Sequence, residues 1–238
     1  MTILEAFEEK RRPLTLRELA EHCGIPVSTS HALVHTLLSR GYLYQTSRRK
    51  DLYPTRRILD MAATIVAFDP YLERIAPTLE QLRLETSETV LLGKRRDDRI
   101  LYLEVLESPQ TIRYSSRAGE LKPLHSSAIG KVMLGAMDTA ALRTWLAAHP
   151  LPQITGNTII TCEQLLENLE AGHRCGYFVT SGENVPDVTA VAIPIVINSE
   201  LLGLAVAGPS HRMQPAMQEH VSRLLRAQRR LQELGVAA

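Results

Sequence analysis

The sequence predicts a mixed α/β (α+β) chain in which an N-terminal winged helix-turn-helix domain and a C-terminal α+β domain are joined by a linker helix. Three observations predict this fold. Residues 15–40 read as two short helices around a Gly-containing turn, and a strand hairpin with a basic tip follows them. Asp69-Pro70 then breaks a helical pattern. Beyond that break, strand-like runs alternate with amphipathic helices. The predicted boundaries are residues 1–54, 55–69 and 70–238.

The composition is that of an ordinary globular protein. Hydrophobic residues make up 45% and charged residues 22% of the 238 residues. The most apolar run, residues 58–68, is short and contains Asp60, so neither a membrane span nor an export signal is expected. The cysteines (Cys23, Cys162 and Cys175) are scattered, which favours a reducing compartment and argues against a structural zinc site. We therefore expect a cytoplasmic protein without a metal or cofactor.

The helix-turn-helix is specified by its capping residues. Thr15 and Glu18 have the spacing of a capping box, so a helix is expected to begin there. Gly24 supplies the left-handed residue that ends it. Ser28 is the expected N-cap of the next helix, and Gly41 is expected to close it. The expected buried face of that helix consists of Ala32, Leu33, Val34 and Leu37.

The outward face of this second helix has two possible interpretations. Its expected residues are short or hydrogen-bonding, with no acid among them: Ser28, Thr29, Ser30, His31 and His35. Small hydroxyls at a helix N-terminus can approach phosphates closely, and a helix of this kind can enter the major groove of DNA. An ordinary αα-hairpin with a capped second helix would show the same pattern. These residues alone leave both interpretations open.

The hairpin that follows favours DNA binding. Residues 42–46 and 52–54 read as its strands, and residues 40–57 hold six basic residues against one acid, a local charge of +5 in a chain of net charge +1. A basic wing beside a helix-turn-helix binds phosphates, and each neutralised phosphate adds counterion release. The predicted DNA-binding residues are Thr15, Arg17, Ser28, Thr29, Ser30, His31 and His35, with Arg40, Arg48, Arg49 and Lys50 on phosphates.

The predicted linker helix has an apolar face that is large for an isolated helix. Thr55 is its expected N-cap, and Asp69-Pro70 ends it. The face could pack on the wing of its own chain or against a second subunit. Its residues are Ile58, Leu59, Ala62, Ile65 and Val66.

The C-terminal part is predicted to be one block of antiparallel strands interleaved with helices, without internal repeats. The predicted helices cover residues 71–85, 126–137, 138–148, 161–171 and 215–234, and the predicted strands cover residues 89–94, 100–106, 110–116, 177–180, 189–197 and 202–207.

Residues 124–131, Leu-His-Ser-Ser-Ala-Ile-Gly-Lys, carry the clearest chemical signal of this part. They place hydroxyls and free backbone N–H groups at the start of a helix, which suits a carboxylate. The alternative is purely structural: Ser126 caps the helix and Gly130 permits close packing. The residues by themselves favour this alternative.

Several motifs resemble one known family. The most specific is Pro-Leu-His-x-x-x-x-Gly-Lys at residues 123–131, followed by Gly176-Tyr177 with Glu183, Ala192-Ile-Pro194 and Gly208-Pro209. Together with the winged helix they make the chain similar to the IclR family of bacterial transcriptional regulators over essentially its whole length. The resemblance implies a GAF-like C-terminal domain that binds a small metabolite effector. It also implies homodimers or tetramers that bind partly palindromic double-stranded operators.

The resemblance further implies an effector pocket. The backbone amides of Ala128 and Ile129 would contact a carboxylate, next to His125, Ser126 and Ser127, and Thr111, Tyr114 and Lys122 would form a wall. Thr180, Ala190, Ala205 and Ala207 stand where members that bind small keto acids carry an acid, a thiol and two hydroxyls. Because an alanine leaves a buried ligand hydroxyl unpaired at a cost of about 1–3 kcal/mol, we expect a larger or less polar carboxylic acid, aromatic or alkyl.

Two other classes of function remain as alternatives. A hydrolase would need a nucleophile elbow of the form G-x-S-x-G, which is missing, and an acidic partner for His125, which no spacing supplies. A sensor module that binds a ligand but no DNA is the second alternative. We expect a regulator that is not an enzyme.

Overall fold

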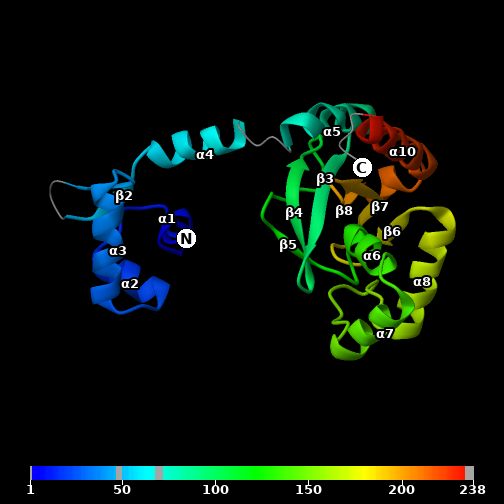
Figure 1. Ribbon diagram of the computed structural model, residues 1–238, viewed down its shortest axis with the longest axis horizontal. Coiled ribbons are helices and arrows are strands. Elements are labelled where there is room, and N and C mark those ends of the chain that lie inside the picture. The colour runs from blue at the N-terminus through cyan, green and yellow to red at the C-terminus, as the bar shows by residue number, and fades with distance from the viewer. Residues whose placement is uncertain (1, 47–49, 68–71, 234–238) are drawn as a thin grey trace. The chain divides into compact units, whose positions relative to one another are not determined.

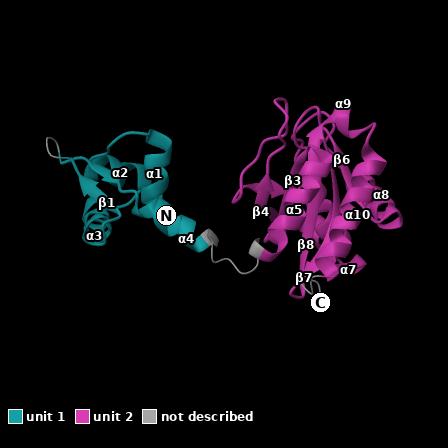
Figure 2. Cartoon of the chain, turned by 90° about the horizontal axis from the view of Figure 1, so that it is seen from above, with its two compact units in different colours: residues 1–73 teal, residues 74–238 magenta. Residues whose placement is uncertain are grey.

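A computed structural model describes residues 2–46, 50–67 and 72–233. Side chains are described up to residue 65 in the second range and from residue 74 in the third. The chain divides into two compact units, residues 1–73 and 74–238 (Figure 2). Among the helices in the described ranges, none is long and apolar enough to cross a membrane.

Unit 1 is a winged helix-turn-helix. Its core collects apolar side chains from α1, from the helix pair α2 and α3 and from both wing strands, among them Phe7, Leu19 and Val34. The wing strands pair antiparallel, with Leu43 opposite Pro54, so the predicted wing is confirmed. The elements are α1 (Thr2–Lys10), α2 (Leu16–Cys23), α3 (Val27–Ser39), β1 (Leu43–Gln45), β2 (Leu52–Pro54) and α4 (Arg57–Ala67) (Figure 1).

The capping predictions for α2 are confirmed. The Thr15 side chain accepts from the Glu18 N–H at 3.2 Å, and the Glu18 carboxylate accepts from the Thr15 N–H at 2.7 Å. Gly24 ends the helix in the left-handed conformation, at φ 63°. Gly41 closes α3 in the same way, at φ 73°, with the Tyr42 N–H donating to the Leu37 carbonyl at 2.8 Å.

The predicted start of α3 is wrong, and its predicted buried face is right only for Val34 and Leu37, which contribute to the core. The helix begins at Val27, because the Pro26 carbonyl accepts the first helical bond from the Ser30 N–H at 3.0 Å. Ser28 therefore lies inside the first turn and is not the N-cap. The buried side is formed by Ser30 and Val34, four residues apart, whereas Ala32 and Leu33 are exposed. The contact of α3 with α2 fixes which side of α3 is buried. The sequence of α3 alone does not show where that contact lies.

The α4 helix exposes most of its apolar side chains within its own unit. Leu59 is 67% and Ile65 63% exposed, and only Ile58 is partly buried, while the side chain of Val66 lies outside the described part. Its contacts with the wing of its own chain include the Arg57 guanidinium, 4.9 Å from the centroid of the Tyr42 ring. Thr55 precedes the helix by two residues, yet its hydroxyl accepts from the Arg57 N–H at 3.3 Å.

Unit 2 is built on one antiparallel sheet with the strand order β5-β4-β3-β8-β7-β6. The helices α5 and α10 lie side by side over one face (Figure 2), and the ion pair of Arg226 with Glu85 joins them. On the other face α6 packs on β7 and β8. The elements are α5 (Leu72–Thr86), β3 (Thr89–Arg96), β4 (Arg99–Leu106), β5 (Leu121–Pro123), α6 (Ala128–Gly135), α7 (Thr139–Ala148), α8 (Cys162–Cys175), β6 (Phe178–Ser181), β7 (Val188–Ile197), β8 (Glu200–Pro209), α9 (Ser210–Met213) and α10 (Met217–Glu233).

Most predicted elements of unit 2 are present, and one is wrong. Residues 110–116 form no strand; side-chain bonds to their backbone hold them instead, since the Thr89 hydroxyl donates to the Tyr114 carbonyl and Arg212 donates to the Ile112 carbonyl. The short strand β5 takes the edge position next to β4, with Leu101 opposite Leu121. The prediction missed β5 and the single-turn helix α9.

Candidate functional site

The outward surface of α3 carries four of the predicted groove residues. Ser28, Thr29, His31 and His35 are all exposed. The assignment of Ser30 to this surface is wrong, because its side chain is fully buried and faces the core of unit 1 beside Val34. A side chain in that position cannot reach a base edge.

Thr15 and Arg17 at the start of α2 are engaged within the helix. The Thr15 hydroxyl accepts from the Glu18 N–H and donates to the Glu18 carboxylate at 2.9 Å, so its only hydrogen is used. Arg12 also bonds Glu18, at 2.7 Å, and together these bonds hold the pKa of Glu18 at about 2. Arg17 pairs with Glu21 at 3.0 Å on the solvent-exposed side of the helix.

The wing places its basic residues toward solvent as far as they are described. Arg40 and Lys50 are exposed, and Lys50 adopts a left-handed backbone conformation at φ 55°. Arg48 and Arg49 lie outside the described residues. The Thr46 N–H donates to the Asp51 carbonyl at 2.8 Å, which closes the loop between the two wing strands.

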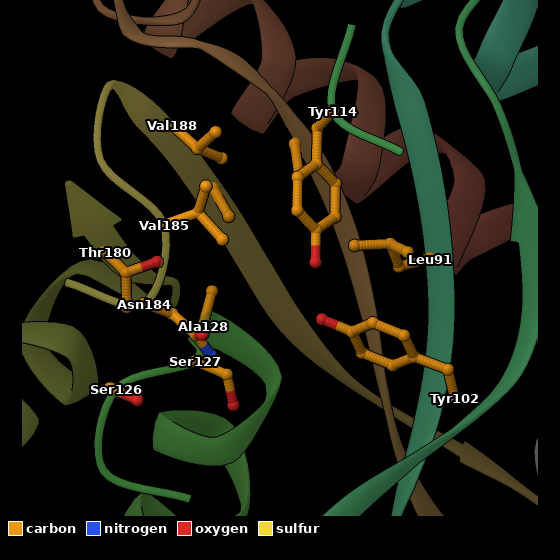
Figure 3. A pocket seen from close by; sticks show the side chains of 12 residues that line it. Leu91, Tyr102, Tyr114, Ser126, Ser127, Ala128, Thr180, Asn184, Val185 and Val188 are labelled. Atoms are coloured by element: carbon orange, nitrogen blue, oxygen red, sulfur yellow. The ribbon is translucent and has the colours of Figure 1, made fainter. Parts of the chain in front are cut away.

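Unit 2 contains a pocket between the start of α6 and the sheet (Figure 3). The cavity is small, about 30 Å³, room for about a water molecule or two, so a larger ligand fits only when the side chains that line it move apart. One wall is the N-terminus of α6, and β3, β4, β7 and β8 contribute from the sheet. The lining residues are Leu91, Tyr102, Tyr114, Ser126, Ser127, Ala128, Thr180, Asn184, Val185, Val188, Ala190 and Ala207.

The start of α6 presents unused donors to this pocket. Ser127 is the N-cap: its hydroxyl accepts from the Gly130 N–H at 3.2 Å and donates to the Pro123 carbonyl at 2.6 Å. The first intrahelical bond runs from the Lys131 N–H to the Ser127 carbonyl, so the N–H groups of Ala128 and Ile129 have no intrahelical acceptor. The Ser126 hydroxyl is fully buried and has no hydrogen-bond partner among the described residues.

The purely structural alternative therefore explains part of this segment. Ser127, not Ser126, caps the helix. Gly130 does permit close packing, because a Cβ there would lie 2.1 Å from the Leu124 carbonyl oxygen. The alternative leaves the Ser126 hydroxyl unexplained, since an unpaired buried polar group is costly and rare.

The fold brings seven of the twelve predicted effector residues together in the pocket: Tyr114, Ser126, Ser127, Ala128, Thr180, Ala190 and Ala207. The side chains of the other five do not line it. Thr111 is exposed, on the segment that is not a strand, and Lys122 lies on the edge strand β5 beside Glu120. His125 is buried with its Nε2 3.1 Å from the Pro152 carbonyl, and burial lowers its pKa. The side chains of Ile129 and Ala205 belong to the core cluster between α6 and the sheet.

Five lining residues were missed by the sequence prediction: Leu91, Tyr102, Asn184, Val185 and Val188. A signal existed for Asn184 and Val185, because they directly follow Glu183 of the family motif. The sequence gives no such signal for Tyr102 and Leu91, since each is one of several apolar residues on its strand. Only the register that sets Leu91 opposite Val105 places them at the pocket.

A buried ion pair lies next to the pocket. The Lys131 ammonium donates to the Glu183 carboxylate at 2.7 Å and to the Val179 carbonyl at 3.3 Å. Burial lowers the pKa of Lys131 and raises that of Glu183, and each charge opposes the shift of the other. The Thr158 hydroxyl also donates to the Glu183 carbonyl, at 2.7 Å. These bonds fix the loop that carries Asn184 and Val185 to α6.

The described residues contain no cluster of three or more His, Cys, Asp or Glu side chains suited to a metal ion. The pocket of unit 2 offers hydrogen-bond donors at the start of α6 and apolar side chains from the sheet.

Comparison with known proteins assigns both units. The family model for the bacterial transcriptional regulator IclR C-terminal domain matches residues 69–231, and that for the IclR helix-turn-helix domain matches residues 1–47. The HTH-type transcriptional regulator KdgR of Dickeya chrysanthemi is 27% identical over 97% of this chain and 76% of its own length. The regulator BhcR of Paracoccus denitrificans is 29% identical over 85% of this chain and 74% of its own.

Solved structures show the same fold. The Thermotoga maritima IclR matches with a TM-score of 0.78 at 23% identity, covering 98% of both chains. An IclR homolog of Microbacterium hydrocarbonoxydans, crystallised as a complex with 4-hydroxybenzoate, matches with a TM-score of 0.76 at 22% identity over 95% of this chain and 92% of that one.

Proposed function

The chain belongs to the IclR family of bacterial transcriptional regulators, and we propose that a small carboxylic acid bound in the pocket of unit 2 alters the operator affinity of its winged helices. The observation that carries this proposal is the buried, unpartnered hydroxyl of Ser126 beside the free N–H groups at the start of α6. The 4-hydroxybenzoate complex of the Microbacterium homolog supports the same class of ligand.

The chemistry of the α6 start suits an anion. A helix N-terminus carries a partial positive charge and directs its first N–H groups outward. A carboxylate oxygen could accept from Ala128 and Ile129, and the second oxygen could accept from the Ser126 hydroxyl. That bond would remove the cost of about 1–3 kcal/mol of a buried hydroxyl without a partner. The walls formed by Val185, Val188 and the alanines suit an apolar body.

The DNA-binding surface is proposed to consist of α3 and the wing. Ser28, Thr29, His31 and His35 would face base edges in the major groove, and Ser30 is removed from this set. The basic residues of the wing would contact phosphates: Arg40, Arg48, Arg49 and Lys50.

The regulator is proposed to act as a homodimer or tetramer on partly palindromic double-stranded DNA. The exposed apolar side chains of α4 support this, because Leu59 and Ile65 have no cover within unit 1. Effector binding can change operator affinity only by its differential affinity for two arrangements of the subunits, typically about 1–3 kcal/mol. The relatives named above are transcriptional regulators, and we propose no catalytic activity.

A titration of the purified protein with benzoate and with benzamide, followed by calorimetry, tests the effector assignment. We expect benzoate to bind and benzamide to bind at least tenfold more weakly, since the amide lacks the charge that the α6 N-terminus attracts. Ser126→Ala should weaken benzoate binding, whereas Ser222→Ala, an exposed serine on α10, should not. Equal affinities for the acid and the amide would contradict a carboxylate site.

A gel-shift titration with the DNA upstream of the protein's own gene, repeated at several salt concentrations, tests the proposed DNA binding. A steep fall in affinity with rising salt is expected of a surface that neutralises several phosphates. Absence of binding at low salt would instead favour a sensor without DNA-binding activity.

A further inference from the structure

The pocket has a second polar end, opposite the start of α6, made by two tyrosines. Tyr102 comes from β4 and Tyr114 from the segment between β4 and β5. Tyr102 is only 5% exposed and Tyr114 is partly buried. Their hydroxyl groups point toward each other at one side of the cavity, across from Ala128 and Ser127 (Figure 3). Two phenols so placed require a chemical explanation, since buried hydroxyls need partners.

The backbone of both tyrosines is fixed by hydrogen bonds. The Thr89 hydroxyl donates to the Tyr114 carbonyl at 2.5 Å, and the Tyr102 N–H donates to the Glu120 carbonyl at 3.0 Å. Arg212 holds the same segment through the Ile112 carbonyl at 2.9 Å. The backbone that carries the two tyrosines is therefore fixed before a ligand arrives, which lowers the entropic cost of binding.

The hydrogen-bond inventory of the pair leaves one donor over. The Tyr102 and Tyr114 hydroxyls face each other (Figure 3), and the Lys122 ammonium lies beside the pair, 5.9 Å from the centroid of the Tyr102 ring. Two phenols carry two hydrogens, and a bond between them would use one. Lys122 has donors only, so it cannot accept the second hydrogen. One O–H hydrogen of the pair is therefore available to a ligand.

The charge behind the tyrosines is balanced. Lys122 lies with its ammonium 5.9 Å from the centroid of the Tyr102 ring, and Glu120 neutralises it at 2.8 Å. The Ser116 hydroxyl in turn donates to Glu120. This end of the pocket thus offers a hydrogen-bond donor without net positive charge. Such an end suits a neutral acceptor better than a second carboxylate, which would need a cation to offset its desolvation.

We propose that Tyr102 and Tyr114 recognise a hydroxyl or another neutral hydrogen-bond acceptor at the far end of the effector. The effector class is then a bipolar monocarboxylic acid, with its carboxylate on the α6 start, an apolar body between Val185, Val188 and Leu91, and a neutral polar group at the tyrosine pair. This inference rests on the proposed effector function. It adds a neutral polar group to the larger or less polar acid expected from the sequence, because that expectation considered only Thr180, Ala190, Ala205 and Ala207 at this end.

Calorimetric titration of the full chain with three acids of similar size tests the proposal: 4-hydroxybenzoate, its near-isostere 4-methylbenzoate, and terephthalate. We expect 4-hydroxybenzoate to bind at least tenfold more tightly than 4-methylbenzoate, a difference of about 1.4 kcal/mol, and terephthalate to bind more weakly than 4-hydroxybenzoate. Tyr102→Phe and Tyr114→Phe should each reduce the hydroxyl preference below threefold while leaving 4-methylbenzoate within twofold of its original affinity.

Tyr177→Phe is the matched control, because the Tyr177 hydroxyl bonds Gln218 outside the pocket and its loss should leave the preference unchanged. Equal affinities of the wild-type chain for the hydroxy and methyl acids would overturn this inference and leave the carboxylate site standing. A preference that survives in both pocket variants would also overturn it. Failure of all three acids to bind would contradict the carboxylate site itself, and the inference with it.

Discussion

Removing one partner of the buried pair of Lys131 and Glu183 is a demanding test of how unit 2 is held together. The Lys131 side chain is fully buried and that of Glu183 is 8% exposed, so Lys131→Met leaves an uncompensated carboxylate in the interior. Such a loss costs about 3–5 kcal/mol. For a domain of 150–250 residues, about 2–4 °C per kcal/mol gives a fall in Tm of roughly 6–20 °C.

The fluorescence of Trp145 provides the assay. It is the only tryptophan of the chain and is buried in the core cluster that includes α6, so its signal reports the unfolding of unit 2 alone. Lys94→Met is the control, because Lys94 and Glu200 form a pair of similar length, 2.9 Å, that is exposed to solvent. Removing an exposed pair costs at most about 1 kcal/mol.

The loss should also depend on pH in a defined direction. Burial raises the pKa of Glu183, and Lys131 supplies the largest opposing effect. Without Lys131 the pKa of Glu183 rises further above that of the unfolded chain, so the folded state binds a proton more tightly than the unfolded state does. The deficit of Lys131→Met relative to the wild type therefore shrinks as pH falls from 7 toward 5. The double variant Lys131→Met, Glu183→Leu should recover part of the loss at pH 7, because it buries no charge.

Two outcomes would refute this reasoning. One is a Lys131→Met variant no less stable than Lys94→Met. The other is a double variant whose loss is the sum of the two single losses, since additivity would mean that the two groups do not interact in the folded state.

Three further predictions concern other parts of the chain. His31→Ala should relax sequence preference at one operator position by about 1–3 kcal/mol, whereas Arg49→Ala should weaken all sequences about equally and reduce the salt slope; equal losses on every sequence in gel shifts would contradict that division. Gly130→Ala should destabilise unit 2 by about 1–3 kcal/mol and weaken benzoate binding, because its Cβ would lie 2.1 Å from a backbone oxygen, while Gly156→Ala, with open space around it, should do neither. Ile65→Glu should shift the protein toward monomers in light scattering if α4 pairs with a second copy.

The local elements were predictable where a residue determines its own backbone. Gly24 and Gly41 end their helices in the left-handed conformation, and the Thr15 capping box is present, because these effects need only neighbours in sequence. The phase of α3 was not predictable in this way. Ser30 turned out to be buried and Leu33 exposed because contact with α2 fixes the rotation of the helix.

The pocket shows the same limit at a larger scale. Its α6 wall was predicted from one short segment, but only with the family resemblance, because hydroxyls at a helix start also fit a purely structural cap. The opposite wall depends on strand register. Tyr102 reaches the pocket only because β4 pairs with β3 in one alignment, and a shift of one residue would turn its side chain to the other face. Tyr114 was identified through family resemblance, while its own segment was mistaken for a strand.

A bipolar effector would give this fold a physical means of linkage. Its carboxylate would bond α6, which Lys131 already ties to the loop of Asn184 and Val185. Its far end would bond Tyr102 on β4 and Tyr114 on the segment that follows β4. The strand β4 lies toward the other edge of the sheet from β6. Without ligand, no bond among the described residues joins Ser126 to the tyrosine pair. An effector that bonds both ends therefore favours the arrangement in which they are correctly spaced, and such differential affinity is what any coupling to DNA requires.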